Sequence, residues 1–192
     1  MRRALPIVVL VAVAAVVVIG LSQAGGGTGS APEQRFSLQR ALQRLEGAPK
    51  PLAALHGQAS DLLTGGPKDF RARLRALRGH PVVVNKWASW CGPCRHEFPI
   101  FQQVSAERGR TVAFVGLDAG DGTKPAREFL GDYPVPYPSY EDPDEAIARD
   151  IGAPANYPIT VFYDERGEQA FIRQGGYRSV AQLEGDIDRY LG

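Results

Sequence analysis

The first apolar segment of the chain has no polar face. Between residues 5 and 21, only Pro6 and Gly20 interrupt a run of Ala, Val, Ile and Leu. As a helix, these 17 residues would be about 26 Å long, which is short for a hydrocarbon core of about 30 Å and long for the core of a signal peptide. The run has no polar face, no capping residue and a terminal position, all of which are unlike a helix in the core of a small domain. The pattern predicts an uncleaved signal anchor over residues 1–23, with a cleaved signal peptide as the alternative.

Two arginines orient this segment. Arg2 and Arg3 precede the run at residues 5–21, and the positive-inside rule keeps that end in the cytoplasm. We therefore expect a single-pass protein of the cell membrane whose remaining chain is extracytoplasmic, or a secreted protein if cleavage occurs. Residues 24–33 are rich in Gly, Ser, Thr and Ala, which is typical of a flexible linker.

Beyond residue 33, the apolar positions alternate between helical and strand spacing. Helices are predicted over residues 36–45, 69–77, 93–107, 124–130, 144–151 and 179–191. Strands are predicted over residues 81–87, 111–117, 159–163 and 168–173. Residues 51–66 allow a short helix around Asp61, and residues 132–143 read as a loop with room for a short strand.

The order of these elements predicts an α/β fold. Strands that are separated by helices pair in parallel, and a hairpin around Gly167 adds an antiparallel strand. We expect a central mixed β-sheet flanked by helices. On this pattern, residues 34–78 form a helical N-terminal extension and residues 79–192 form the domain that contains the sheet.

Composition excludes several classes of protein. Hydrophobic residues make up 44% of the chain and charged residues 22%, unlike a disordered chain or a polytopic membrane protein. The formal net charge of +1 gives no support to nucleic-acid binding. Two cysteines are too few for a disulfide-rich scaffold or a zinc ribbon. We expect a monomer.

The two cysteines stand where a strand is followed by a helix. Cys91 and Cys94 come shortly after the predicted strand 81–87, and the next helix begins at Pro93. Unpaired N–H groups at a helix N-terminus favour an anion and lower the pKa of a thiol from about 8.5 toward 7. We expect Cys91 to be a partly exposed nucleophile and Cys94, one turn further on, to be the resolving thiol. Gly92 has no side chain to obstruct a substrate.

Other roles for the cysteines are weaker. A metal site would need further soft ligands, and the nearest candidates are His80 and His96. Covalent haem attachment needs a histidine directly after the second cysteine, where the chain has Arg95. An inert disulfide across so short a loop would add little stability. We expect no metal and no cofactor.

The sequence around the cysteines resembles a known family. Residues 86–99, Lys-Trp-Ala-Ser-Trp-Cys-Gly-Pro-Cys-Arg-His-Glu-Phe-Pro, are similar to the active-site segment of extracytoplasmic thioredoxin-like proteins of the TlpA, ResA and cytochrome c biogenesis group. The similarity runs from about residue 79 to the C-terminus and includes Tyr-Pro-Ile-Thr-Val-Phe at residues 157–162. It implies a thioredoxin fold and a substrate-binding edge formed by Trp90, Gly92, Pro93 and Tyr157.

In this family a cis-proline faces the two cysteines. Pro154 and Pro158 both lie in the right region, and Pro158 fits better because a predicted strand begins directly after it. A cis bond there would direct the backbone of Tyr157 toward an extended substrate near Cys91. An ordinary trans proline at the start of the strand is the alternative.

The family also implies a role for Glu97. Cytoplasmic thioredoxins carry a buried aspartate at the position of Asn85, and an asparagine cannot accept a proton. Glu97 lies three residues after Cys94 on the same helical face. The resemblance implies that Glu97 takes the proton from Cys94, and a solvated surface glutamate is the alternative.

These features predict a membrane-tethered thiol–disulfide oxidoreductase. Gly-Pro between the cysteines matches reducing thioredoxins, so we expect a reductase of exported protein disulfides, with apocytochrome c among the candidates, that a membrane electron donor re-reduces. A disulfide-forming oxidase and a redox-inactive binding module of the same fold are the alternatives. A thiol peroxidase would need a Thr-x-x-Cys setting, which the chain lacks.

Overall fold

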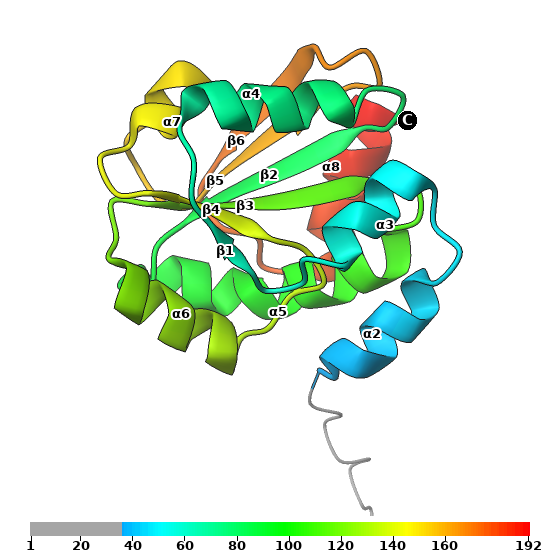
Figure 1. The fold of residues 1–192 in the computed structure, drawn as a ribbon, viewed down its shortest axis with the longest axis horizontal. Helices are drawn as coiled ribbons and strands as arrows, with labels where there is room; N and C mark the ends of the chain where they lie inside the picture. The colour runs from blue at the N-terminus through cyan, green and yellow to red at the C-terminus, as the bar shows by residue number, and fades with distance from the viewer. Residues whose placement is uncertain (1–35) are drawn as a thin grey trace, which may run out of the picture. The chain divides into compact units, whose positions relative to one another are not determined.

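Residues 36–192 are the part of the chain that the computed structural model describes, and Figure 1 traces their course. The predicted signal anchor, with its apolar run at residues 5–21, and the linker at residues 24–33 lie outside this part. Among residues 36–192, no helix is both long enough and apolar enough to cross a membrane. The membrane segment therefore stays a prediction from the sequence.

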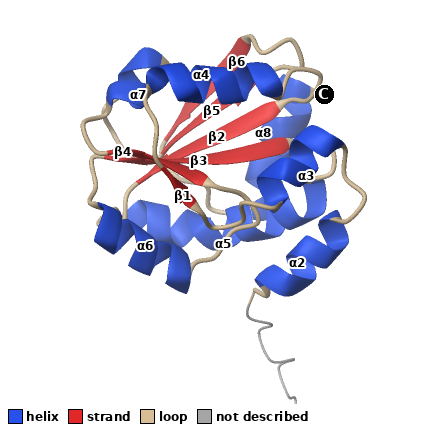
Figure 2. Ribbon diagram, in the orientation of Figure 1, coloured by secondary structure: helices blue, strands red, loops and turns tan. Residues whose placement is uncertain are grey.

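Within the described residues, a six-stranded mixed sheet has the strand order β1-β4-β3-β2-β5-β6 (Figure 2). Each of the pairs β1–β4, β4–β3 and β3–β2 is parallel, whereas β2–β5 and β5–β6 are antiparallel. The strands are β1 (Leu62–Leu63), β2 (Val82–Trp87), β3 (Ala113–Ala119), β4 (Ser139–Asp142), β5 (Ile159–Tyr163) and β6 (Gln169–Gln174). The predicted mixed sheet is confirmed.

Helices cover both faces of the sheet. Residues of α5, α6 and α8 share one hydrophobic cluster with Val83 and Trp87, and residues of α3, α4 and α7 share another with Val82 and Val84. Figure 1 shows α4 and α7 on the side of the sheet opposite to α5 and α6. The helices are α2 (Leu38–Leu45), α3 (Lys50–His56), α4 (Pro67–Ala76), α5 (Gly92–Arg108), α6 (Thr123–Asp132), α7 (Ala146–Asp150) and α8 (Val180–Leu191).

Strand β2 leads into the cysteine pair, and Trp87 anchors its end. The Trp87 ring stacks on Phe129 at 4.9 Å and meets Phe98 edge-on at 5.2 Å. Its Nε1 donates a hydrogen bond to Ser139 Oγ at 3.2 Å. This packing against α5, α6 and β4 holds in place the turn that carries Cys91.

The short helix predicted as possible around Asp61 is not present, so this prediction is wrong. Leu62 and Leu63 form β1 instead, and they pair with Ser139 and Tyr140 of β4. A two-residue strand has no periodicity of its own, so only its distant partner reveals it. The stretch 34–78 is therefore not purely helical, while the short strand allowed within residues 132–143 is confirmed as β4.

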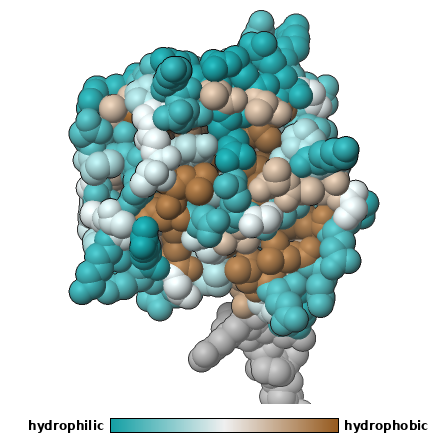
Figure 3. Space-filling model, viewed as in Figure 1, coloured by the Kyte–Doolittle hydropathy of each residue, from teal (hydrophilic) through white to brown (hydrophobic). Residues whose placement is uncertain are grey.

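Apolar side chains also reach the surface beside α2 and α3. Leu42, Leu45 and Ala53 line an open groove between these helices. A hydrophobic patch is visible over this region on the face drawn in Figure 3. Neither cysteine lines this groove, and the groove is not part of the site described below.

Asp142 connects β4 to the short helix α7. It is 2% exposed, and its carboxylate accepts hydrogen bonds from the backbone N of Ile147 at 2.9 Å and of Ala148 at 2.8 Å. Asp142→Asn is expected to lower the free energy of unfolding by about 1–2 kcal/mol, because an amide offers one acceptor oxygen instead of two. Urea denaturation measures this effect. The exposed Asp144→Asn is the control, and equal stability of the two variants would contradict the prediction.

Candidate active site

Cys91 and Cys94 meet at the first turn of α5. Their sulfur atoms are joined by a disulfide bond of 2.04 Å. Cys91 is the N-cap residue of α5, and its Sγ accepts a hydrogen bond from the backbone N of Cys94 at 3.2 Å. The structure thus places Cys91 at the helix N-terminus, as the sequence predicts. In a reduced pair, a donor at this position would favour a thiolate on Cys91.

The expected exposure of Cys91 is wrong for the oxidised pair. Cys91 is 3% exposed and Cys94 is fully buried, because both pack with Phe98 in the hydrophobic cluster beneath α5. The residues on either side of Cys91 are exposed to solvent instead. Trp90 is 60% exposed, and Gly92 is exposed as well. A substrate would therefore approach Cys91 over this edge.

Glu97 is buried rather than solvated, which excludes the alternative of a surface glutamate. It is 0% exposed, and its Oε1 accepts a hydrogen bond from Asn85 Nδ2 at 2.7 Å while Oε2 accepts one from the backbone N of Tyr177 at 3.1 Å. Burial raises the pKa of Glu97 to about 7, although these two hydrogen bonds and the charge of Arg173 act in the opposite direction. The carboxyl group can therefore gain and lose a proton near neutral pH.

The predicted cis bond between Tyr157 and Pro158 is confirmed. Pro158 lies near Glu97 and the start of α5, because atoms of all three surround Gly176. A Cβ atom on Gly176 would lie 3.5 Å from each of Glu97 Oε2, Pro158 Cγ and the carbonyl oxygen of Pro93. The structure therefore brings Pro93, Glu97 and Pro158 together around one glycine.

Gly176 and Tyr177 belong to this site, although the sequence analysis does not single them out. Both residues follow β6. Tyr177 lies 80 residues after Glu97 in the chain. The paired glycines at residues 175 and 176 are the signal that could have indicated a close approach of backbone segments.

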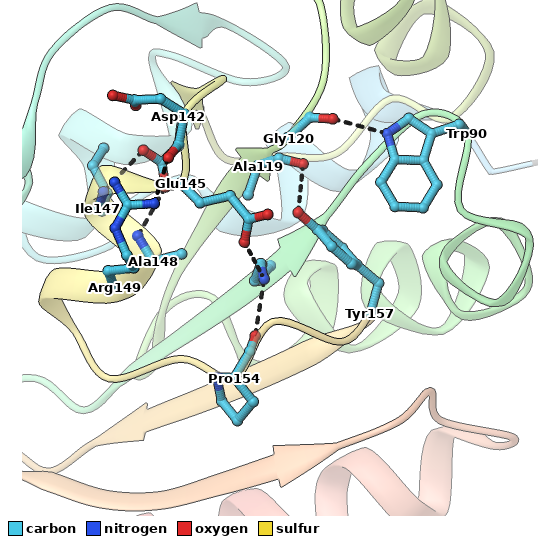
Figure 4. Close-up of polar contacts among 12 residues, drawn as sticks. Trp90, Ala119, Gly120, Asp142, Glu145, Ile147, Ala148, Arg149, Pro154 and Tyr157 are labelled. Carbon is cyan, nitrogen blue, oxygen red and sulfur yellow. Dashed lines mark hydrogen bonds and ion pairs between the residues drawn. The ribbon is translucent and has the colours of Figure 1, made fainter.

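Trp90 and Tyr157 form an aromatic pair at the edge of the site, which we call the aromatic rim. Their rings meet edge-on with centroids 4.9 Å apart. Trp90 Nε1 donates to the carbonyl oxygen of Gly120 at 3.0 Å, and the Tyr157 hydroxyl donates to that of Ala119 at 2.9 Å (Figure 4). The end of β3 thus holds both rings of the predicted substrate-binding edge.

A buried lysine, which the sequence analysis does not identify as part of the site, lies next to this rim. Lys86 is 0% exposed, and its Nζ lies 4.0 Å from the centroid of the Tyr157 ring. A lysine within the β-former run at residues 81–87 is the sequence signal for it, since charged residues are rarely buried without partners.

The chain is similar to known thiol–disulfide proteins. A family model described as Redoxin matches residues 58–187. The thiol-disulfide oxidoreductase ResA of Oceanobacillus iheyensis is 32% identical over 119 residues, covering 60% of this chain and 60% of ResA. The thiol:disulfide interchange protein DsbE of Pseudomonas fluorescens biotype C is 35% identical over 92 residues, covering 47% of this chain and 49% of DsbE. The chain thus spans about half to two thirds of the length of the curated relatives it matches.

Solved structures give the same picture of the fold. A thiol:disulfide interchange protein DsbE from Chlorobium tepidum superposes with a TM-score of 0.57 at 29% identity, covering 62% of this chain and 85% of that one. A DsbF homologue from Corynebacterium diphtheriae superposes with a TM-score of 0.52 at 30% identity, covering 60% of this chain and 75% of that one. The mixed sheet with its helices is therefore a thioredoxin-like α/β fold.

Proposed function

This chain belongs to the Redoxin family, and from that premise we propose that it is a thiol–disulfide oxidoreductase. One observation carries the proposal: Cys91 and Cys94 are close enough to be disulfide-bonded at the first turn of α5. The ionisable Glu97 is buried one turn further along the same helix. An inert structural disulfide has no need of a buried ionisable carboxyl group on the helix that carries it.

In the proposed reaction, the reduced enzyme transfers two electrons to a substrate disulfide. The Cys91 thiolate attacks one substrate sulfur, and the other substrate sulfur leaves as a thiolate. Cys94 then loses its proton and attacks Cys91 Sγ, which releases the second substrate sulfur. The products are a substrate dithiol and the Cys91–Cys94 disulfide, and a donor of two electrons must reduce the enzyme again.

Glu97 is the proposed acceptor of the Cys94 proton. Its pKa of about 7 suits a group that exchanges protons near neutral pH. Asn85 supports this role, because its Oδ1 is buried without a hydrogen-bond partner while its Nδ2 donates to Glu97. A flip of the Asn85 amide would let Oδ1 accept a hydrogen bond from the protonated carboxyl group. Asn85 can therefore form a hydrogen bond with Glu97 in both of its protonation states.

We assign Pro158 and the aromatic rim to the binding of the substrate chain, together with Gly92 and Pro93. Gly92 and Pro93 are exposed beside the disulfide, and Pro158 lies across from Pro93 at Gly176. An extended peptide that passes over this edge would bring its own disulfide to Cys91.

The proposed substrates are disulfides of exported proteins, with apocytochrome c as the narrower candidate. The basis is the apolar run at residues 5–21 behind two arginines, together with the names of the ResA and DsbE relatives. The protein would then be a monomer tethered to the membrane, with its Redoxin domain outside the cytoplasm and its electron donor in the membrane. A disulfide-forming oxidase of the same proteins is the second candidate.

A redox titration tests the function and its direction. The Cys91–Cys94 pair is equilibrated in glutathione and dithiothreitol buffers, and the reduced fraction is read by thiol alkylation. We expect a potential near that of thioredoxin, about −270 mV, which suits a reductase. A value near about −120 mV would identify an oxidase instead. A pair that fails to exchange with either buffer would leave only the redox-inactive binding module.

A further inference from the structure

Lys86 occupies a position in β2 where an apolar residue would be expected. Its neighbours on the same face of the strand, Val82 and Val84, belong to the hydrophobic cluster beneath α4 and α7. The Lys86 side chain is 0% exposed. An ammonium group in such surroundings is costly unless it has close polar partners.

Three partners surround the Lys86 ammonium group, and all come from one stretch of the chain between β4 and β5. Nζ donates to Glu145 Oε2 at 2.8 Å and to the carbonyl oxygen of Pro154 at 2.9 Å. The third partner is the Tyr157 ring, whose centroid lies 4.0 Å from Nζ. In Figure 4 the bonds from Glu145 and Pro154 meet at one nitrogen atom, to the left of the Tyr157 ring. Lys86 thus ties β2 to the segment that leads into Pro158.

Glu145 is itself held in place. It has a left-handed backbone conformation with φ of 56°, and its backbone N donates to the carbonyl oxygen of Asp142 at 3.0 Å. The hydrogen bond from Lys86 is the largest cause of a lowered pKa at Glu145. The carboxylate therefore stays charged at neutral pH and gives Lys86 a fixed ionic partner.

Tyr157 also contacts the residue directly before Cys91 and the end of β3. Trp90, directly before Cys91, meets the Tyr157 ring at 4.9 Å, and the Tyr157 hydroxyl is bonded to Ala119. The ring is thus held by Lys86, by Trp90 and by the end of β3. A cation held against an aromatic face away from water is attracted to the ring more strongly than one at an exposed site.

We propose that Lys86 is a positioning residue that fixes Tyr157 and the segment before Pro158 for binding of the substrate chain. The proposal rests on the function proposed above. Lys86 does not touch the cysteines in this scheme, so it acts on substrate affinity and not on the sulfur chemistry. Its effect passes through the aromatic rim.

Lys86→Met tests the proposal, with the exposed Lys68→Met on α4 as the matched control. Methionine keeps the length of the side chain, and replacing a buried charge by an apolar residue is often tolerated. We expect KM for a peptide disulfide to rise about tenfold, which corresponds to about 1.4 kcal/mol of binding, while kcat and the alkylation rate of Cys91 change less than about twofold. Lys68→Met should match the wild type.

A double-mutant cycle shows whether Lys86 acts through Tyr157. In Tyr157→Leu the ring is absent, so adding Lys86→Met should raise KM by much less than it does in the wild type. A purely structural lysine would instead give additive effects. Unchanged KM in Lys86→Met, or additivity in the cycle, would overturn the proposal.

A second measurement is independent of enzyme activity. Trp87 is fully buried and Trp90 is 60% exposed, so acrylamide quenching of fluorescence reports mainly on Trp90. In the oxidised protein, Lys86→Met should increase quenching because Trp90 loses a fixed Tyr157 ring. If the wild type shows no disulfide exchange, the proposed function fails, and the quenching result still decides the role of Lys86. If Lys86→Met does not fold, Glu145→Gln should raise both quenching and KM, and unchanged values would refute the proposal.

Discussion

Cys91→Ser is expected to abolish disulfide reduction, whereas Cys94→Ser should accumulate mixed disulfides with the substrate. Cys91 is the N-cap of α5, and its sulfur accepts a hydrogen bond from the backbone N of Cys94. Serine at position 91 removes the thiolate that attacks the substrate disulfide, because a hydroxyl group stays protonated near neutral pH. Serine at position 94 allows the first attack but not the second.

The two cysteine variants are distinguished by trapping. Each variant is incubated with a peptide disulfide, and covalent adducts are resolved by mass spectrometry. The double variant, with serine at both positions, is the control for adventitious adducts. Stable adducts on Cys94 in the Cys91→Ser protein would reverse the assignment of nucleophile and resolving thiol.

Glu97→Gln is expected to slow the second step of the reaction about 100-fold, which is a typical contribution of a general base. Cys94 is fully buried, and burial in an apolar site raises the pKa of a thiol, so Cys94 needs an acceptor for its proton. The glutamine should fit, because after a flip of the Asn85 amide it can donate to Asn85 Oδ1, which has no partner in the wild type, while its oxygen accepts from the backbone N of Tyr177. First attack by Cys91 should hardly change.

Stopped-flow reduction of a peptide disulfide separates the two steps. In the wild type, release of the mixed disulfide should accelerate as pH rises through about 7, where Glu97 loses its proton, and this rise should be absent in Glu97→Gln. Glu107→Gln, an exposed residue on the same helix, is the control. Wild-type rates of release in Glu97→Gln between about pH 6 and 8 would show that another group accepts the proton.

The stability of the oxidised protein provides a check on Glu97 that does not depend on catalysis. Its pKa is raised from 4.5 to about 7, so the folded state binds the proton more tightly than the unfolded state does. The resulting stabilisation is complete below about pH 4.5 and is lost as pH rises through about 7. Relative to Glu97→Gln, the wild type should therefore lose about 3 kcal/mol across this range. Parallel stability curves for the two proteins would contradict the raised pKa.

The sequence alone determined the local elements and the position of the cysteine pair. Strand β5 begins and ends as predicted at residues 159 and 163, and Ser179 caps α8 because its side chain accepts a hydrogen bond from the backbone N of Gln182. Cys91 lies at the start of α5 because a strand and a short turn precede it and Pro93 begins the helical pattern directly after it. Periodicity, capping residues and prolines act within a few residues of the chain, so the sequence carries these features directly.

Only the tertiary structure decided how the chemistry of the site is tuned. Glu97 is one turn beyond Cys94 in the sequence, but its raised pKa comes from burial in the folded protein, and its hydrogen-bond partners Asn85 and Tyr177 lie 12 and 80 residues away. Lys86 appears in the sequence as one charge in a strand, and its partners Glu145 and Pro154 lie 59 and 68 residues away. Strand β1 likewise exists only because β4 pairs with it. Burial, ion pairing and strand pairing join segments that are far apart in the chain, and local patterns of hydrophobicity do not record such contacts.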